Sequence, residues 1–137
     1  MGQKILIVED NEPIRENTIE LLELFNYNVF TACNGQDGLD LAFQEHPDLI
    51  LSDIRMPVMD GYTLLKCVRE QPIFNNTYFV FFTASSEKKE IEQGLLMGAN
   101  DYIIKPFTGD ELLSRLTKLL GKPSLLISVS YLLFFII

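Results

Sequence analysis

Residues 5–11 read ILIVEDN, four apolar residues followed at once by two acids and an amide. Four more short apolar or β-prone runs follow along the chain, and each also stops at or near polar residues: 28–32, 49–51, 78–82 and 102–104. Runs this short and this apolar are typical of strands buried on both faces of a parallel sheet. We therefore expect five parallel strands.

Amphipathic segments with helix signals separate these runs. Pro13 falls in the first turn of one segment, Asn34 precedes another as a candidate N-cap, and Thr108 with Glu111 forms a capping box. Gly98 and Gly121 are placed to end helices. A strand must reach its parallel neighbour through a right-handed crossover, which puts helices on both faces of the sheet. The order predicts a (βα)5, open, doubly wound α/β sandwich.

The composition limits the functional classes. The chain has 137 residues, which suits one domain, and its 11 Lys and Arg against 19 Asp and Glu give a net charge of −8. A surface this acidic is a poor match for the phosphates of DNA or RNA, so we expect no direct nucleic-acid binding.

The ends of the chain and its cysteines indicate the compartment. The N-terminal apolar run is too short for a signal peptide and no small-residue cleavage site follows it. Cys33 and Cys67 lie far apart and cannot complete a zinc set with His46, so we expect two buried thiols in a reducing compartment. These features predict a cytoplasmic protein.

Chemistry-bearing side chains follow four of the five expected strands. Glu9 and Asp10 come after the first, Asp53 after the third, Thr83 after the fourth and Lys105 after the fifth. The carboxyl ends of parallel strands share one edge of the sheet, where open α/β folds place their sites. The first loop has no glycine and up to three negative charges, which disfavours an anionic cofactor and favours a divalent cation.

The expected acidic cluster needs a counter-charge. Two carboxylates at ~4 Å repel by about 4 kcal/mol at an effective dielectric constant of 20. Lys105 supplies one positive charge, and Mg²⁺ would close the deficit. A solvated acidic rim without a ligand is the alternative. With Mg²⁺, a lysine and a hydroxyl beside it, Asp53 could attack a phosphoryl group while Asp10 holds the metal.

The motifs, taken together and in order, resemble those of a response-regulator receiver domain of the chemotaxis-regulator type. They are VEDN at residues 8–11, DxxMPxMDG at 53–61, FTA at 82–84, GAxDY at 98–102 and KPF at 105–107. The resemblance runs from about Lys4 to Gly121, so we expect a receiver domain over residues 1–121. It implies a flavodoxin-like fold with strand order 2-1-3-4-5.

The resemblance also implies a phosphorylation switch of a two-component system. A sensor histidine kinase or a histidine phosphotransfer protein would donate a phosphoryl group to Asp53, with Mg²⁺ as cofactor. The output would leave through the fourth helix, fifth strand and fifth helix, toward a downstream target that the sequence does not identify. Such a domain catalyses its own phosphoryl transfer and autodephosphorylation but is mainly a regulatory switch, so the sequence leaves enzyme status open.

The site roles are carried over residue by residue. Mg²⁺ would be held by Glu9, Asp10, Asp53 and the backbone carbonyl of Arg55. Lys105 would pair with the phosphoryl group, and its bond to Pro106 is expected to be cis. Thr83 would move toward the phosphoryl oxygen and Tyr102 would turn inward after it. The Arg55 side chain could also shield the acyl phosphate from water.

Two other functional classes are weighed against the switch. A Mg²⁺-dependent aspartyl-phosphate phosphatase needs an acid two residues after its nucleophile, and Arg55 stands there. A receiver that serves only as an interaction module would have lost an acid, the aspartate or the lysine, and none is lost.

Residues 122–137 form an apolar tail of unknown role. The thirteen residues from Leu125 to Ile137 carry no charge and fall short of the roughly 20 needed to span a bilayer. The tail could be the start of a truncated membrane or dimerisation segment, a segment that packs on the domain or a second copy, or an expression or reading-frame scar. We favour self-association.

Overall fold

The structure, a computed structural model, describes residues 2–121, which form five strands and five α-helices in strict alternation. The strands are β1 (Lys4–Val8), β2 (Asn28–Ala32), β3 (Leu49–Ser52), β4 (Tyr78–Thr83) and β5 (Asp101–Ile104). The helices are α1 (Glu12–Leu24), α2 (Gly35–Glu45), α3 (Gly61–Arg69), α4 (Lys88–Leu96) and α5 (Gly109–Leu120), with a 3-10 turn, η1 (Pro72–Phe74), before β4. All strand pairs are parallel and the order is β2-β1-β3-β4-β5. The predicted fold and strand order are confirmed.

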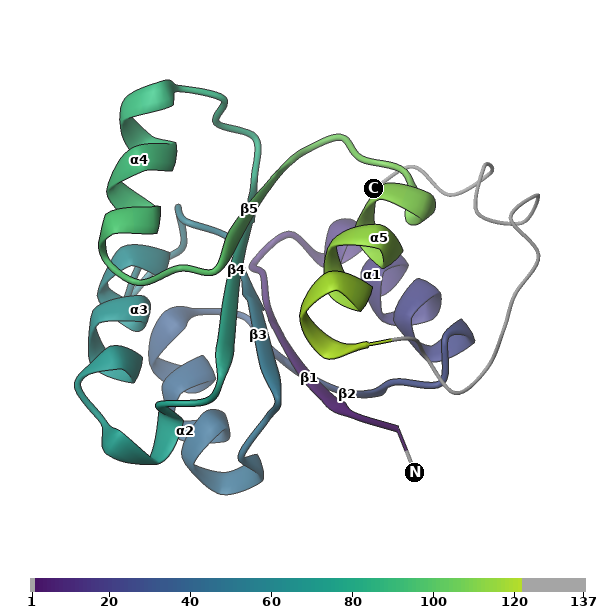
Figure 1. Cartoon of the computed structure of the whole chain (residues 1–137), viewed down its shortest axis with the longest axis horizontal. Coiled ribbons are helices and arrows are strands. Elements are labelled where there is room, and N and C mark those ends of the chain that lie inside the picture. Colours follow the sequence, from purple (N-terminus) through teal and green to yellow (C-terminus); the bar gives the residue numbers. More distant parts are fainter. Residues whose placement is uncertain (1, 122–137) are drawn as a thin grey trace.

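Helices cover both faces of the sheet. Figure 1 shows α1 and α5 on one face and α2, α3 and α4 on the other. Each interface has its own apolar cluster: Ile7, Leu22 and Leu116 belong to the first, and Leu6, Leu65 and Phe81 to the second. Alternate residues of the same strand therefore serve opposite cores, as the period of a strand requires. This double burial explains why the central strands read as continuous apolar runs.

Side-chain caps fix where four of the helices begin. Asn11, Asn34, Asp60 and Thr108 each accept a backbone N–H from the third residue beyond. Helix α4 begins after Glu87, whose side chain makes no cap bond. Ser85 Oγ instead accepts the Glu87 N–H at 3.4 Å, so this serine closes a turn ahead of the helix.

The expectation of two buried thiols is wrong. Both cysteines are free, but Cys33, which follows the edge strand β2, is exposed, and Cys67 is only partly buried. Within residues 2–121, no helix is both long enough and apolar enough to cross a membrane. The expectation of self-association through the tail lies outside the described residues.

Candidate functional site

Three carboxylates meet at the carboxyl edge of the sheet. Strands β1 and β3 pair with Val8 opposite Ser52, so the residues that follow them emerge side by side. Ligand oxygens of Glu9, Asp10 and Asp53 all lie within 4.8 Å of one another. Glu9 is fully buried, Asp53 is half-buried and Asp10 is exposed. The cluster is therefore closed to solvent at Glu9 and open to solvent at Asp10.

Lys105 is the cation of this cluster. Its Nζ donates to Glu9 Oε1 and, at 2.9 Å, to Asp53 Oδ2. The Lys105 N–H donates to the Thr83 carbonyl at 2.8 Å, which ties the end of β5 to β4, and the Lys105–Pro106 peptide is cis, as expected. Its Nζ also lies 4.7 Å from the centre of the Phe82 ring. Lys105 therefore bridges the two less exposed acids, Glu9 and Asp53.

The pKa of Glu9 reflects its burial. Burial raises its pKa from 4.5 to about 7, although the Lys105 hydrogen bond and charge oppose the shift. The negative charge of Asp53 adds to the rise. Since desolvation outweighs the lysine, one cation does not compensate this group of acids.

The residues fit a hard divalent cation. Three carboxylates share one ammonium, which leaves two negative charges when all are ionised. Mg²⁺ takes oxygen ligands, binds through one or two protein carboxylates and keeps several waters, which suits a cluster that opens to solvent at Asp10. The donor atoms, the net charge and the solvent access of the cluster therefore all suit Mg²⁺.

The hydroxyl and the aromatic residue expected to switch lie beside the cluster. Thr83 is buried at the end of β4, and its Oγ1 lies 3.5 Å from the donating Ser85 N–H. Tyr102 is buried, packs against Phe81 with ring centres 6.0 Å apart, and donates its hydroxyl to the Ser85 carbonyl at 3.2 Å. Its side chain thus already occupies the inward position that the resemblance placed after phosphorylation. Burial raises the pKa of Tyr102 to about 12.

The side chain of Arg55 does not join the acidic cluster. Its guanidinium donates to Glu90 Oε1 of α4 at 2.7 Å. Tyr62 donates its hydroxyl to the Glu90 carbonyl at 3.0 Å. No local sequence pattern predicts these roles of Glu90 and Tyr62, because Arg55 and Glu90 lie 35 residues apart in the chain.

Comparison with known proteins decides the family. The profile of the response regulator receiver domain matches residues 5–117. The chain belongs to the receiver domain family of response regulators. The matched range includes the acidic cluster, Thr83, Tyr102 and Lys105, so the family assignment rests on the part of the chain that carries the candidate site.

Individual relatives agree with the receiver assignment. The chain is 40% identical over 123 residues to the response regulator ArlR of Staphylococcus aureus, covering 87% of this chain and 53% of the relative. The solved structure of the chemotaxis protein CheY4 of Vibrio cholerae has a TM-score of 0.83 and 32% identity, covering 88% of this chain and all of that one. The receiver domain of the sensor histidine kinase PA1611 of Pseudomonas aeruginosa, with a magnesium ion coordinated in its active-site cleft, has a TM-score of 0.79 and 35% identity, covering 89% of this chain and all of that one.

The curated relatives are longer than this receiver domain. The chain spans about half the length of the relatives it matches first, 49% and 53%.

Proposed function

We propose that this receiver domain is the phosphorylation-dependent switch of a two-component system, and that Asp53 is its phosphoacceptor. One observation carries the proposal: Asp53 lies within 4.8 Å of two further acids and is hydrogen-bonded by Lys105 at 2.9 Å. That is the charge arrangement needed to bring two anions, a carboxylate and a phosphoryl group, together.

The chain's own residues have distinct tasks in the transfer. A carboxylate oxygen of Asp53 attacks the phosphorus of a phosphohistidine, the P–N bond breaks, and the released imidazole nitrogen takes up a proton on the donor. The Ile54 N–H donates to Asp53 Oδ1 at 2.7 Å and so fixes the carboxylate plane. Lys105 passes from the Asp53 oxygen to a phosphoryl oxygen, and the Thr83 hydroxyl moves to a second one.

Mg²⁺ fits as the cofactor, held by Glu9, Asp10, Asp53 and the Arg55 carbonyl. When bound, the ion neutralises the charge that gathers on the phosphoryl oxygens. Asp10 is the exposed acid of the cluster and is therefore the ligand best placed to receive the ion from solvent. Glu9 is buried and hydrogen-bonded to Lys105, so besides holding the ion it mainly sets the electrostatic environment of the buried side of the cluster.

The partners follow from the same chemistry. The donor is a sensor histidine kinase or a histidine phosphotransfer protein, and the compartment is the cytoplasm. The output surface is formed by α4, β5 and α5. Phosphorylation adds a charge of about −2 beside Thr83 and Tyr102, which shifts the balance between two arrangements of that surface. The downstream target is a protein, and the apolar tail mediates self-association.

Two alternatives remain open to test. A phosphatase needs a general acid two residues after Asp53, and the side chain there, Arg55, is a permanent cation that pairs with Glu90. An interaction module without phosphorylation would have no use for the buried Glu9 and its lysine. We therefore favour the switch over both.

Intact-mass measurement tests the proposal. The protein is incubated with Mg²⁺ and a small phosphodonor such as phosphoramidate, and we expect one phosphate adduct that is lost in Asp53→Asn. Asp60→Asn, an acid in the same loop that caps α3, is the matched control and keeps the adduct. No adduct on the unmodified chain would favour the interaction module. Turnover of many donor equivalents would favour the phosphatase.

A further inference from the structure

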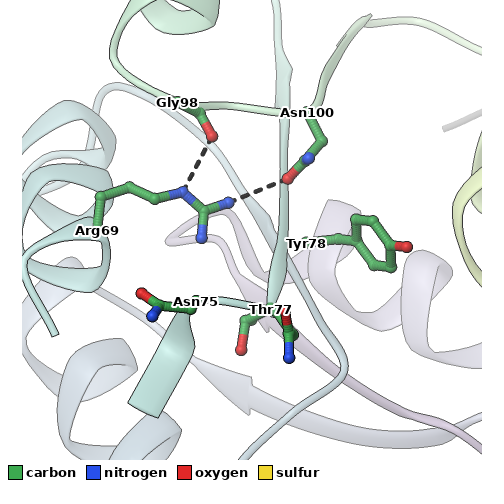
Figure 2. A pocket seen from close by; sticks show the side chains of 7 residues that line it. Arg69, Asn75, Thr77, Tyr78, Gly98 and Asn100 are labelled. Atoms are coloured by element: carbon green, nitrogen blue, oxygen red, sulfur yellow. Dashed lines mark hydrogen bonds between the residues drawn. The ribbon is translucent and has the colours of Figure 1, made fainter. Parts of the chain in front are cut away.

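A polar pocket lies at the opposite end of the strands from the acidic cluster. It has a volume of about 480 Å³ and sits where β4 and β5 begin, whereas the acids follow the ends of the strands. Figure 2 shows it from close by. Its side chains are those of an arginine, three asparagines, a threonine and a tyrosine, and no carboxylate lines it: Arg69, Asn75, Asn76, Thr77, Tyr78 and Asn100.

Arg69 brings an uncompensated positive charge into this pocket. Its guanidinium donates to the Gly98 carbonyl at 3.0 Å, to the Phe74 carbonyl at 3.2 Å and to Asn100 Oδ1 at 3.0 Å, all neutral acceptors. Among residues 2–121 it takes part in no ion pair, whereas Arg55 and Arg115 each have a carboxylate partner. A guanidinium has five N–H groups, so these three bonds leave two of them available.

The position of this guanidinium is fixed. Gly98 has φ +109°, and a Cβ there would lie 3.2 Å from both Cγ and Nε of Arg69. Glycine therefore lets the arginine lie flat against the loop before β5. Partial burial lowers the pKa of Arg69, which is the electrostatic cost of holding a cation there without a counter-ion.

Asn100 adds donors beside the guanidinium. Its Oδ1 accepts from Arg69 Nη2 and also from the Phe79 N–H at 2.8 Å, so both bonds require the oxygen to face inward. The Nδ2 group of Asn100 is thereby left on the exposed side of the amide. Asn75 and Asn76 supply further exposed amide groups on the same pocket wall. The pocket combines one cation with several N–H donors and no acid.

We propose that the pocket around Arg69 and Asn100 binds a small oxyanion, the carboxylate or phosphate group of a ligand. A protein with a net charge of −8 repels anions at long range, so the attraction must be local, and this pocket supplies it. Bidentate recognition of planar or tetrahedral oxyanions is what two adjacent guanidinium N–H groups do best. The site is separate from Asp53 and does not depend on the phosphorylation proposal.

Heteronuclear NMR on the full chain, free of metal and at low salt, tests this site. Inorganic phosphate and acetate are titrated separately, and the Arg69 Nε–H and Asn100 side-chain amide signals are followed. We expect saturable shifts at both, larger for phosphate if the ligand is a phosphate ester and larger for acetate if it is a carboxylate. The same shifts in Asp53→Asn would separate this site from the phosphorylation site.

Two variants make the test sharp. Asn100→Asp keeps both acceptor bonds of Oδ1 but supplies an internal counter-ion to Arg69, so the fold is retained and anion affinity falls at least about tenfold. Arg69→Gln removes the charge with a similar loss. Arg115→Gln, an arginine that already has Asp101 as partner, is the control and leaves the titration unchanged.

The outcomes are decisive. A saturable shift of the Arg69 Nε–H that Asn100→Asp abolishes, together with a shift of the Asn100 amide that Arg69→Gln abolishes, supports the site. No saturable shift at Arg69 and Asn100, or shifts that persist unchanged in Asn100→Asp, would overturn it.

Discussion

At the scale of single residues, Glu9 has the most unusual environment among the acids of the cluster. It is fully buried, it is hydrogen-bonded to Lys105, and its pKa of about 7 lies above the ordinary 4.5. Between these two values the folded protein holds a proton that the unfolded chain has released. The contribution that Glu9 makes to the unfolding free energy is therefore fully present below pH 4.5 and is lost as the pH rises to about 7.

We predict that the metal-free protein loses up to about 3 kcal/mol of unfolding free energy between pH 4.5 and 7 through this one group. Urea unfolding across this range measures the slope, and Glu9→Gln should flatten it. Glu16→Gln, an exposed acid on α1, is the matched control and keeps the slope. An identical slope in Glu9→Gln and the unmodified protein would contradict the assignment.

The same residue links protons to Mg²⁺. A divalent cation favours the ionised carboxylate, so Mg²⁺ binding below pH 7 should release a proton from Glu9 and Mg²⁺ affinity should rise toward neutral pH. Calorimetry in buffers of different ionisation enthalpy counts the proton. In Glu9→Gln the released proton should be absent while Asp10 and Asp53 still bind the ion, more weakly.

At the scale of elements, α4 is held to the site by side-chain contacts rather than by a capped start. Glu87, its N-cap residue, makes no side-chain cap bond. Instead Glu90 takes Arg55 on its carboxylate and Tyr62 on its carbonyl, and a Cβ at Gly94 would lie 2.9 Å from the Phe81 ring. These contacts join α4 to the loop after Asp53, to α3 and to β4. We therefore expect a change near Asp53 to reach α4 through Arg55, in addition to the route proposed through Thr83 and Tyr102.

Local signals predicted most elements, and long-range contacts escaped them. Asn34 and Thr108 carry their capping role in their own neighbourhood, and the apolar runs gave all five strands. The 3-10 turn at Pro72 and the start of α4 after Glu87 depend on weaker turn chemistry. The pairing of Arg55 with Glu90, and the choice of Lys105 to bond Glu9 as well as Asp53, are set by tertiary packing that no window of sequence contains.

For Arg55 we predict a role in the lifetime of the phosphorylated state. An exposed cation contributes up to about 1 kcal/mol, so Arg55→Ala should shorten the aspartyl-phosphate half-life by up to roughly fivefold, because the shield against water is lost. Glu90→Gln should leave the half-life equal or longer, since it frees Arg55 from α4. Phosphate release after removal of the donor measures both.

A matched control separates this effect from general surface charge. Lys88→Ala breaks another ion pair of α4, with Glu92, away from the loop after Asp53, and should not change the half-life. Hydrogen exchange of the α4 amides should accelerate in both Arg55→Ala and Glu90→Gln. If the half-life is the same in Arg55→Ala as in the unmodified protein, Arg55 is an anchor for α4 and not a shield.

At the scale of the whole molecule, the two ends of the strands carry sites of opposite charge. Glu9, Asp10 and Asp53 gather around one lysine at the carboxyl ends, whereas a pocket at the opposite end holds Arg69 and is lined by no carboxylate. Between them lie two apolar clusters, whose last buried member among residues 2–121 is Leu116. The described part of the chain thus places its chemistry at the ends of the strands and its apolar packing in the layers between sheet and helices.

Residues 2–121 contain all the described strands, helices and apolar clusters, so we expect removal of residues 122–137 to leave the fold intact. We predict that the chain ending at Gly121 unfolds at nearly the same urea concentration as the full chain and accepts phosphate on Asp53 with the same stoichiometry. We also predict a lower mass in light scattering, because the uncharged apolar run from Leu125 to Ile137 is an association surface when it is exposed. The full chain with Phe134→Asp and Leu126→Asp controls for length alone and should match the shorter chain in mass. An unchanged mass in both would assign self-association, if the full chain shows it, to the body of the domain.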